Sequence, residues 1–212
     1  MLAAALFGVV AVVLVWVQTS QFPGDESIYR WADSGDVSRV IIRISRTVES
    51  LGEPAMAVIT VAVLAIVVAR RIDLRAALFV IGAAGVVLLV DALKAVIGPT
   101  DLWQQASTRP GGNFPSGHVA FVTAVFGAAF WLAPGRRNID VRLALLVIIG
   151  LEGLSVLALT LHLLSDVIAG YCVGLAWLIL VRVVLYETSL LSRIGVNVPA
   201  RDNGSPSTRQ ST

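Results

Sequence analysis

Two histidines are present in the chain, and each stands in a short polar motif beside a long apolar run. His162 precedes Asp166 by four residues, a spacing that on a helix brings two side chains to one face. The carboxylate can then hold one imidazole nitrogen, which leaves the other free to attack an electrophile. We therefore interpret His162 as a candidate nucleophile oriented by Asp166, although such pairs also occur without a catalytic role.

The second histidine, His118, ends the motif Pro115-Ser116-Gly117-His118. Proline and serine suit the first turn of a helix, whose unpaired backbone N–H groups form an anion site. Helix capping accounts for Ser116 and Gly117, but it does not account for His118. We therefore expect His118 to face the anion that binds at this helix start.

The only lysine, Lys94, follows Asp91 by three residues near the end of an apolar run. The two could form a structural ion pair, but ionisable groups at membrane depth are costly and favour a functional interpretation. Together with the histidine motifs, Lys94 indicates phosphoryl chemistry. One histidine would attack phosphorus, the other would protonate the leaving oxygen, and cations and N–H groups would stabilise the phosphoryl oxygens.

The elements that must position these groups are membrane helices. The chain has 212 residues, 57% of them hydrophobic, and a mean hydropathy of +0.84, which indicates an all-α integral membrane protein with one membrane domain over residues 1–198. The tail 199–212 is polar and is expected to be disordered. Six runs are long enough to cross a bilayer, at residues 2–18, 54–69, 75–97, 117–133, 141–161 and 164–185.

The distribution of arginines predicts the orientation, because basic residues accumulate in cytoplasmic loops. Three clusters mark one face: Arg70, Arg71 and Arg75; Arg136, Arg137 and Arg142; and Arg193, Arg201 and Arg209 in the tail. Both termini are therefore expected in the cytoplasm. The histidine motifs and the lysine are expected at the extracytoplasmic face of what we take to be a bacterial plasma membrane.

Between Asp36 and Gly52, apolar residues recur at helical spacing. This pattern predicts an amphipathic helix on the membrane surface after the first span. Its arginines, Arg39, Arg43 and Arg46, would contact lipid headgroups or cover the site; a solvated face is an equal alternative.

Composition excludes other classes of function. The net charge is only +2 and the arginines are dispersed, so nucleic acid is not an expected partner. The single cysteine, Cys172, cannot form an internal disulfide and is expected to pack like a small hydrophobe. Glu152 lies within the fifth predicted span, where it would form a helix–helix hydrogen bond or, as the lesser alternative, belong to a proton path.

The motifs together resemble the type 2 phosphatidic acid phosphatase (PAP2) superfamily, in its membrane lipid phosphatase branch. The resemblance rests on Lys94, Phe114 to His118, Ser155 and the sequence His162-x-x-x-Asp166. It implies a six-helix bundle with an outward site, in which His162 becomes phosphohistidine, Asp166 orients it and His118 is the acid. The resemblance also implies that phosphate is held by Lys94, Ser116 and the Gly117 N–H, with Ser155 nearby.

Two arginines of the family pattern are missing from their expected places. Asp101-Leu102 stands where the family has Arg-Pro, and Val156 follows Ser155 where the family has arginine. In one interpretation other cations substitute, with Arg109 the strongest candidate and the three arginines of the amphipathic segment weaker ones. In the other, the chain is a non-catalytic lipid-binding or partner subunit; a lipid transporter is a third alternative.

The sequence therefore predicts a metal-independent phosphatase without cofactors. Its expected substrate is a membrane lipid phosphate, such as a polyprenyl phosphate or diphosphate or a phosphatidate-like lipid. A homodimer or a membrane partner protein is a possibility that the sequence leaves open.

Overall fold

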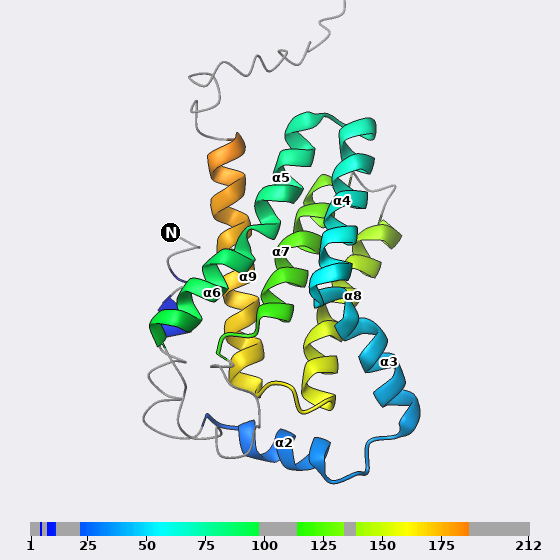
Figure 1. Cartoon of the computed structure of the whole chain (residues 1–212), viewed down its shortest axis with the longest axis vertical. Helices are drawn as coiled ribbons and strands as arrows, with labels where there is room; N and C mark the ends of the chain where they lie inside the picture. The colour runs from blue at the N-terminus through cyan, green and yellow to red at the C-terminus, as the bar shows by residue number, and fades with distance from the viewer. Residues whose placement is uncertain (1–4, 6–7, 12–21, 98–113, 134–138, 187–212) are drawn as a thin grey trace, which may run out of the picture.

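The computed structural model describes residues 5, 8–11, 22–97, 114–133 and 139–186 (Figure 1). Within these ranges every regular element is a helix and no strand occurs, which confirms the predicted all-α class. In chain order the elements are α2 (Asp25–Asp33), α3 (Arg39–Glu49), the 3-10 turn η1 (Ser50–Gly52), α4 (Pro54–Arg71), α5 (Leu74–Ala84), α6 (Val86–Ile97), α7 (Gly117–Leu132), α8 (Ile139–Ala158) and α9 (Leu164–Tyr186).

Four helical segments in the described part of the chain are long and apolar enough to cross a membrane: α4, the α5–α6 pair, α8 and α9. Large apolar side chains on their outer faces are exposed, among them Ile59, Val63 and Leu154, as a lipid-facing surface requires. The protein is therefore an integral membrane protein. Helix α7 is shorter, and the predicted span 2–18 lies almost entirely outside the described residues, so the count of six spans stays a prediction.

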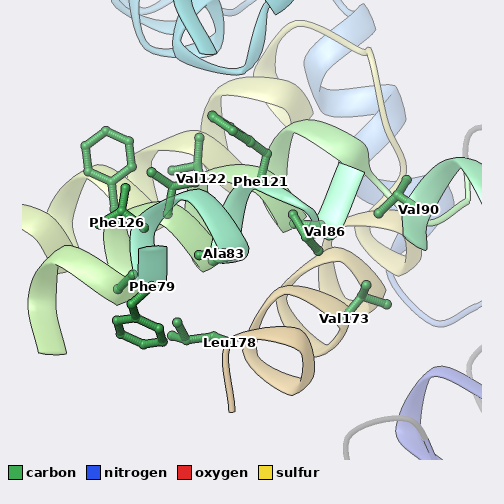
Figure 2. Close-up of a cluster of buried hydrophobic side chains, with 14 of the residues drawn as sticks. Phe79, Ala83, Val86, Val90, Phe121, Val122, Phe126, Val173 and Leu178 are labelled. Atoms are coloured by element: carbon green, nitrogen blue, oxygen red, sulfur yellow. The ribbon is translucent and has the colours of Figure 1, made fainter. Parts of the chain in front are cut away.

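Helix α7 forms the centre of the bundle and contacts α5, α6, α8 and α9 (Figure 1). Its sequence is apolar on all sides, the pattern of a helix buried by its neighbours, and most of its residues are buried. Phe121, Val122 and Phe126 of α7 join Phe79 of α5 and Leu178 of α9 in the main apolar core (Figure 2).

Close contact between α7 and α9 depends on two glycines in α9. A Cβ at Gly170 would lie 2.8 Å from the Ser116 carbonyl oxygen, and one at Gly174 would lie 2.7 Å from the Ala120 carbonyl oxygen. The small residues therefore let the two backbones touch, as their spacing of four predicts. This contact aligns the first turns of both helices, where the polar motifs lie.

Arg75 and Arg142 lie at the opposite end of the bundle from these first turns. The Arg75 Nε donates to the Leu185 carbonyl at 2.8 Å, near the end of α9. Arg142 donates to the Ala133 carbonyl at 2.8 Å, just after α7 ends. Arg30 of α2 and the three arginines of α3 lie at the histidine end, so the described arginines do not distinguish the two faces. The predicted orientation stays a prediction.

Helices α2 and α3 lie at the end of the bundle where α7 and α9 begin (Figure 1). Helix α3 occupies the predicted amphipathic segment and exposes Val40, Ile41 and Ile44, while Ser45 is buried. Helix α2, which has nine residues, was not predicted from the sequence. Both helices supply carboxylates to the candidate site.

Candidate active site

The Pro-Ser-Gly-His motif forms the first turn of α7, as expected. Ser116 caps the helix, and its Oγ accepts a hydrogen bond from the Val119 N–H at 3.5 Å. The Ser116 N–H donates to the Asp166 carbonyl at 3.1 Å. This bond joins the two histidine motifs directly, although α7 and α8 lie between them in the sequence.

The His162–Asp166 pair forms, but not as two residues of one helix. Helix α8 ends at Ala158, earlier than predicted, because the chain turns at Thr160, whose φ is 54°. His162 therefore lies in the connection before α9. Its Nδ1 lies 3.3 Å from Asp166 Oδ2, which also accepts the Leu163 N–H at 3.0 Å. Both side chains are at least nine-tenths buried, so the ring is held with Nε2 as the remaining reactive nitrogen.

Lys94 connects the end of α6 to both motifs. Its Nζ lies 3.9 Å from where a Cβ of Gly117 would be, so the ammonium group faces the first turn of α7. The carboxylates of Asp91 and Asp166 both attract it electrostatically. Lys94 is thus placed to balance charge between the helix start and the His–Asp pair, in agreement with its predicted location at the site.

Asp25, at the start of α2, is a site residue that sequence reasoning missed. It is 2% exposed, and its carboxylate accepts the Ser165 N–H at 2.9 Å and the Ser165 hydroxyl at 2.8 Å. Burial raises the pKa of Asp25, and the charge of Asp166 adds to the rise, against the Ser165 hydrogen bonds that lower it. No local pattern links residues so far apart in the chain. Asp25 therefore fixes the first turn of α9 from outside.

His118 faces two carboxylates that the sequence did not single out. Its Nε2 lies 3.5 Å from Glu49 Oε1 and 3.9 Å from Glu53 Oε1. One ligand atom from each of the three residues lies within 4.8 Å of the others, so the group has the atoms to hold a cation as well as a proton. The helical spacing that predicted α3 was the only available signal for Glu49.

An apolar cleft of about 690 Å³ leads to this polar end. Residues of α4, α5, α6 and α7 line it, chiefly alanines and valines. Lys94, Asp91, Gly117 and His118 are its polar lining residues. The cleft therefore has apolar walls and one charged end, which matches a lipid with an apolar tail and a charged headgroup.

The positions that lack the family arginines are filled differently. Val156 is completely buried in a small apolar cluster with Val119, Leu157 and Val167, so no charge replaces the arginine there. Ser155 is buried in the last turn of α8.

The structure describes only some of the cations considered as replacements. Asp101 and Arg109 lie outside the described residues. Arg39, Arg43 and Arg46 are exposed on α3. Within the described part of the chain, Lys94 is therefore the cation that lies against the motifs.

Comparison with known proteins defines the class. The PAP2 superfamily model matches residues 93–189, from the end of α6 through α9. The fold is similar to that of a crystallised transmembrane PAP2-type phosphatidylglycerolphosphate phosphatase from Bacillus subtilis, with a TM-score of 0.71 and 21% identity over 85% of this chain and 94% of that chain. No curated protein matches the sequence.

The match to the PAP2 superfamily model covers the part of the chain that holds Lys94 and both histidine motifs, and the chain has a fold similar to that of a membrane PAP2-type phosphatase. The resemblance predicted from the motifs is confirmed. The roles of individual residues stay predictions.

Proposed function

We propose that this protein is a lipid phosphate phosphatase that works through a phosphohistidine intermediate. The observation that carries the proposal is the apolar cleft that ends at Lys94, Gly117 and His118. A lipid tail fits its alanine and valine walls, and the charged headgroup then meets the helix start of α7. Polyprenyl phosphates, polyprenyl diphosphates and phosphatidate-like lipids all have this form, and each is a candidate substrate at the extracytoplasmic face.

In the proposed reaction His162 attacks phosphorus through Nε2, because Asp166 holds its Nδ1. Lys94 and the Gly117 N–H at the start of α7 bind the phosphoryl oxygens. His118 gives a proton to the leaving oxygen and then accepts one from the water that hydrolyses phosphohistidine. The proposed sequence of steps is complete without a metal ion.

Purified protein is expected to release phosphate from at least one lipid phosphate in the presence of a chelator. His162→Ala should abolish release, because the nucleophile is gone, and Asp166→Asn should reduce it by about a hundredfold or more. Radiolabelled phosphate from the substrate should be trapped on wild-type protein in an acid-labile, base-stable form. Equal rates for wild type and His162→Ala across the lipid panel would rule the proposal out.

A role for Arg109 is the narrower part of the proposal. If Arg109 replaces a missing phosphate-binding arginine, Arg109→Ala should slow turnover by about tenfold or more, because a charge-assisted bond is lost. Arg201→Ala in the tail is the matched control and should have no effect. An unchanged rate for Arg109→Ala would exclude this role.

The burial of Val156 favours one alternative, a non-catalytic lipid-binding or partner subunit. In that case the cleft should bind a lipid phosphate in wild type and in His162→Ala with equal affinity, while neither releases phosphate.

A further inference from the structure

The junction between α3 and α4, residues 49–53, is built around the ring of His118. Glu49 lies 3.5 Å and Glu53 lies 3.9 Å from its Nε2. An ideal Cβ at Gly52 would lie 2.2 Å from Cδ2 of the same ring. The imidazole therefore packs against a residue that must lack a side chain, beside two carboxylates.

These contacts distinguish the two edges of the ring. Cδ2 and Nε2 form one edge, and that edge faces the junction. The opposite edge, which carries Nδ1, is therefore turned away from Glu49. A carboxylate close to Nε2 favours the imidazolium form, because opposite charges stabilise one another. In that form the ring holds a second proton on Nδ1 that it can give away.

The charges around the ring come from four elements. Glu49 of α3 and Glu53 at the start of α4 face it directly. Glu152 of α8 lies behind Glu49, near enough for the two charges to repel; it is completely buried, and neither of its oxygens has a hydrogen-bond partner in the described residues. Asp91 and Lys94 of α6 line the same cleft. Within the described residues, negative charge therefore prevails on this side.

We propose that Glu49 is a positioning residue for His118, which it holds as an imidazolium whose Nδ1 proton goes to the leaving oxygen. This inference rests on the phosphatase function proposed above. As His162 Nε2 forms its bond to phosphorus, the P–O bond breaks, and its electron pair stays on the leaving oxygen, which takes the Nδ1 proton. In the second half, water gives a proton to Nδ1 as its oxygen displaces His162. The other proton stays bonded to Nε2 of His118, beside the Glu49 carboxylate, in both halves of the reaction.

Leaving-group dependence tests the proposal, because only a poor leaving group needs a proton. In Glu49→Gln, turnover of a lipid phosphate with an alkoxide leaving group should fall by about tenfold or more, with little change in KM. Turnover of p-nitrophenyl phosphate, whose leaving group departs as an anion, should fall by less than about threefold. Asp140→Asn, an exposed carboxylate at the far end of α8, is the matched control and should change neither rate.

Nuclear magnetic resonance provides a readout independent of turnover, because tag-free protein contains only His118 and His162. With ring-labelled histidine, His162→Asn assigns the two signals. In Glu49→Gln the ring signals of His118 should move while those of His162 stay in place, because Glu49 lies against the His118 ring. Gly52→Ala should disturb the same signal, because its Cβ occupies the space of the ring.

Several results would overturn the proposal. Equal losses on both substrates would mean that Glu49 serves folding or phosphate binding. Unchanged rates together with unchanged His118 ring signals would mean that Glu49 does not act on His118. Stoichiometric Zn²⁺ binding that disappears in Glu49→Gln and is required for turnover would make the carboxylates metal ligands instead. Wild type that hydrolyses neither substrate would overturn the phosphatase function. The change of the His118 ring signals in Glu49→Gln would still report on the Glu49–His118 contact.

Discussion

Single residues far apart in sequence hold the two histidines in place. Asp166 binds the ring of His162 through its side chain and the Ser116 N–H through its carbonyl. Asp25 in turn holds Ser165, its neighbour in the first turn of α9. A motif of five residues is thus oriented by contacts that come from three helices.

Asp25 provides a test at this scale. Asp25→Ala leaves the Ser165 N–H and hydroxyl without their partner and should destabilise the protein by about 1–3 kcal/mol. Asp25→Asn can keep both bonds and should be milder. Thermal unfolding in detergent measures the difference, and equal losses for both variants would contradict this role.

The difference in stability between wild type and Asp25→Asn should change with pH in a definite direction. The pKa of Asp25 is raised above its ordinary value of 3.8. The wild-type side chain therefore contributes most to the stability of the folded protein below pH 3.8. Its contribution falls as the pH rises through the folded pKa. The stability of wild type relative to Asp25→Asn should therefore decrease from pH 4 upwards, and an increase would refute the assignment.

Val156 tests whether the missing arginine can be restored. Val156→Arg places a long charged side chain in a fully buried apolar site, so we expect a loss of stability of about 1–3 kcal/mol and no gain in turnover. Val156→Leu, which keeps the site apolar, is the comparison for stability. Faster turnover in Val156→Arg would show that the space still accepts the arginine.

At the scale of elements, the site depends on how closely α7 and α9 approach. Gly174→Ala puts a Cβ 2.7 Å from the Ala120 carbonyl and 2.8 Å from the Thr123 Cβ. The helices must then separate, and we expect a loss of about 1–3 kcal/mol and lower turnover. Gly150→Ala on α8 has no atom within 4 Å of the new Cβ and should be neutral or stabilising. Equal effects in the two variants would show that the contact does not matter.

The sequence predicted most of the elements but not how their ends meet. The long apolar runs 54–69, 75–97 and 164–185 locate α4, the α5–α6 pair and α9, because hydrophobic length is a strong signal in membrane proteins. The short motifs located His162 and His118, because few polar groups occur in such a chain. The carboxylates of Asp25 and Glu49 could not be predicted as site residues, since only tertiary packing brings their short polar segments to the histidines.

The histidine motifs lie at one end of the molecule, and the apolar cleft leads from that end between α4 and the helices α5, α6 and α7. Orientation can be tested in the Cys172→Ala background. Ser34→Cys, beside α2, should react with an impermeant maleimide from outside the cell, and Arg71→Cys, at the end of α4, should not. The reverse labelling pattern would place the site in the cytoplasm.

The cleft makes a prediction about chain length. Ala62→Trp fills it from α4 and should raise KM for long-chain lipid phosphates by about tenfold while leaving p-nitrophenyl phosphate turnover unchanged. Val63→Trp, on an exposed position of the same helix outside the cleft lining, should affect neither substrate. An unaltered KM in Ala62→Trp would exclude the cleft as the site of the lipid tail.

Helix α4 is both a wall of this cleft and the continuation of Glu53 and Gly52, which touch His118. A bulky tail that pushes α4 outward therefore pulls on the residues beside the proton donor, whereas the α7–α9 contact that holds the nucleophile is not attached to that wall. The fit of the lipid tail and the position of His118 are thus linked through residues 49–53. Substrates of different tail length should for this reason differ in how strongly their turnover depends on Glu49.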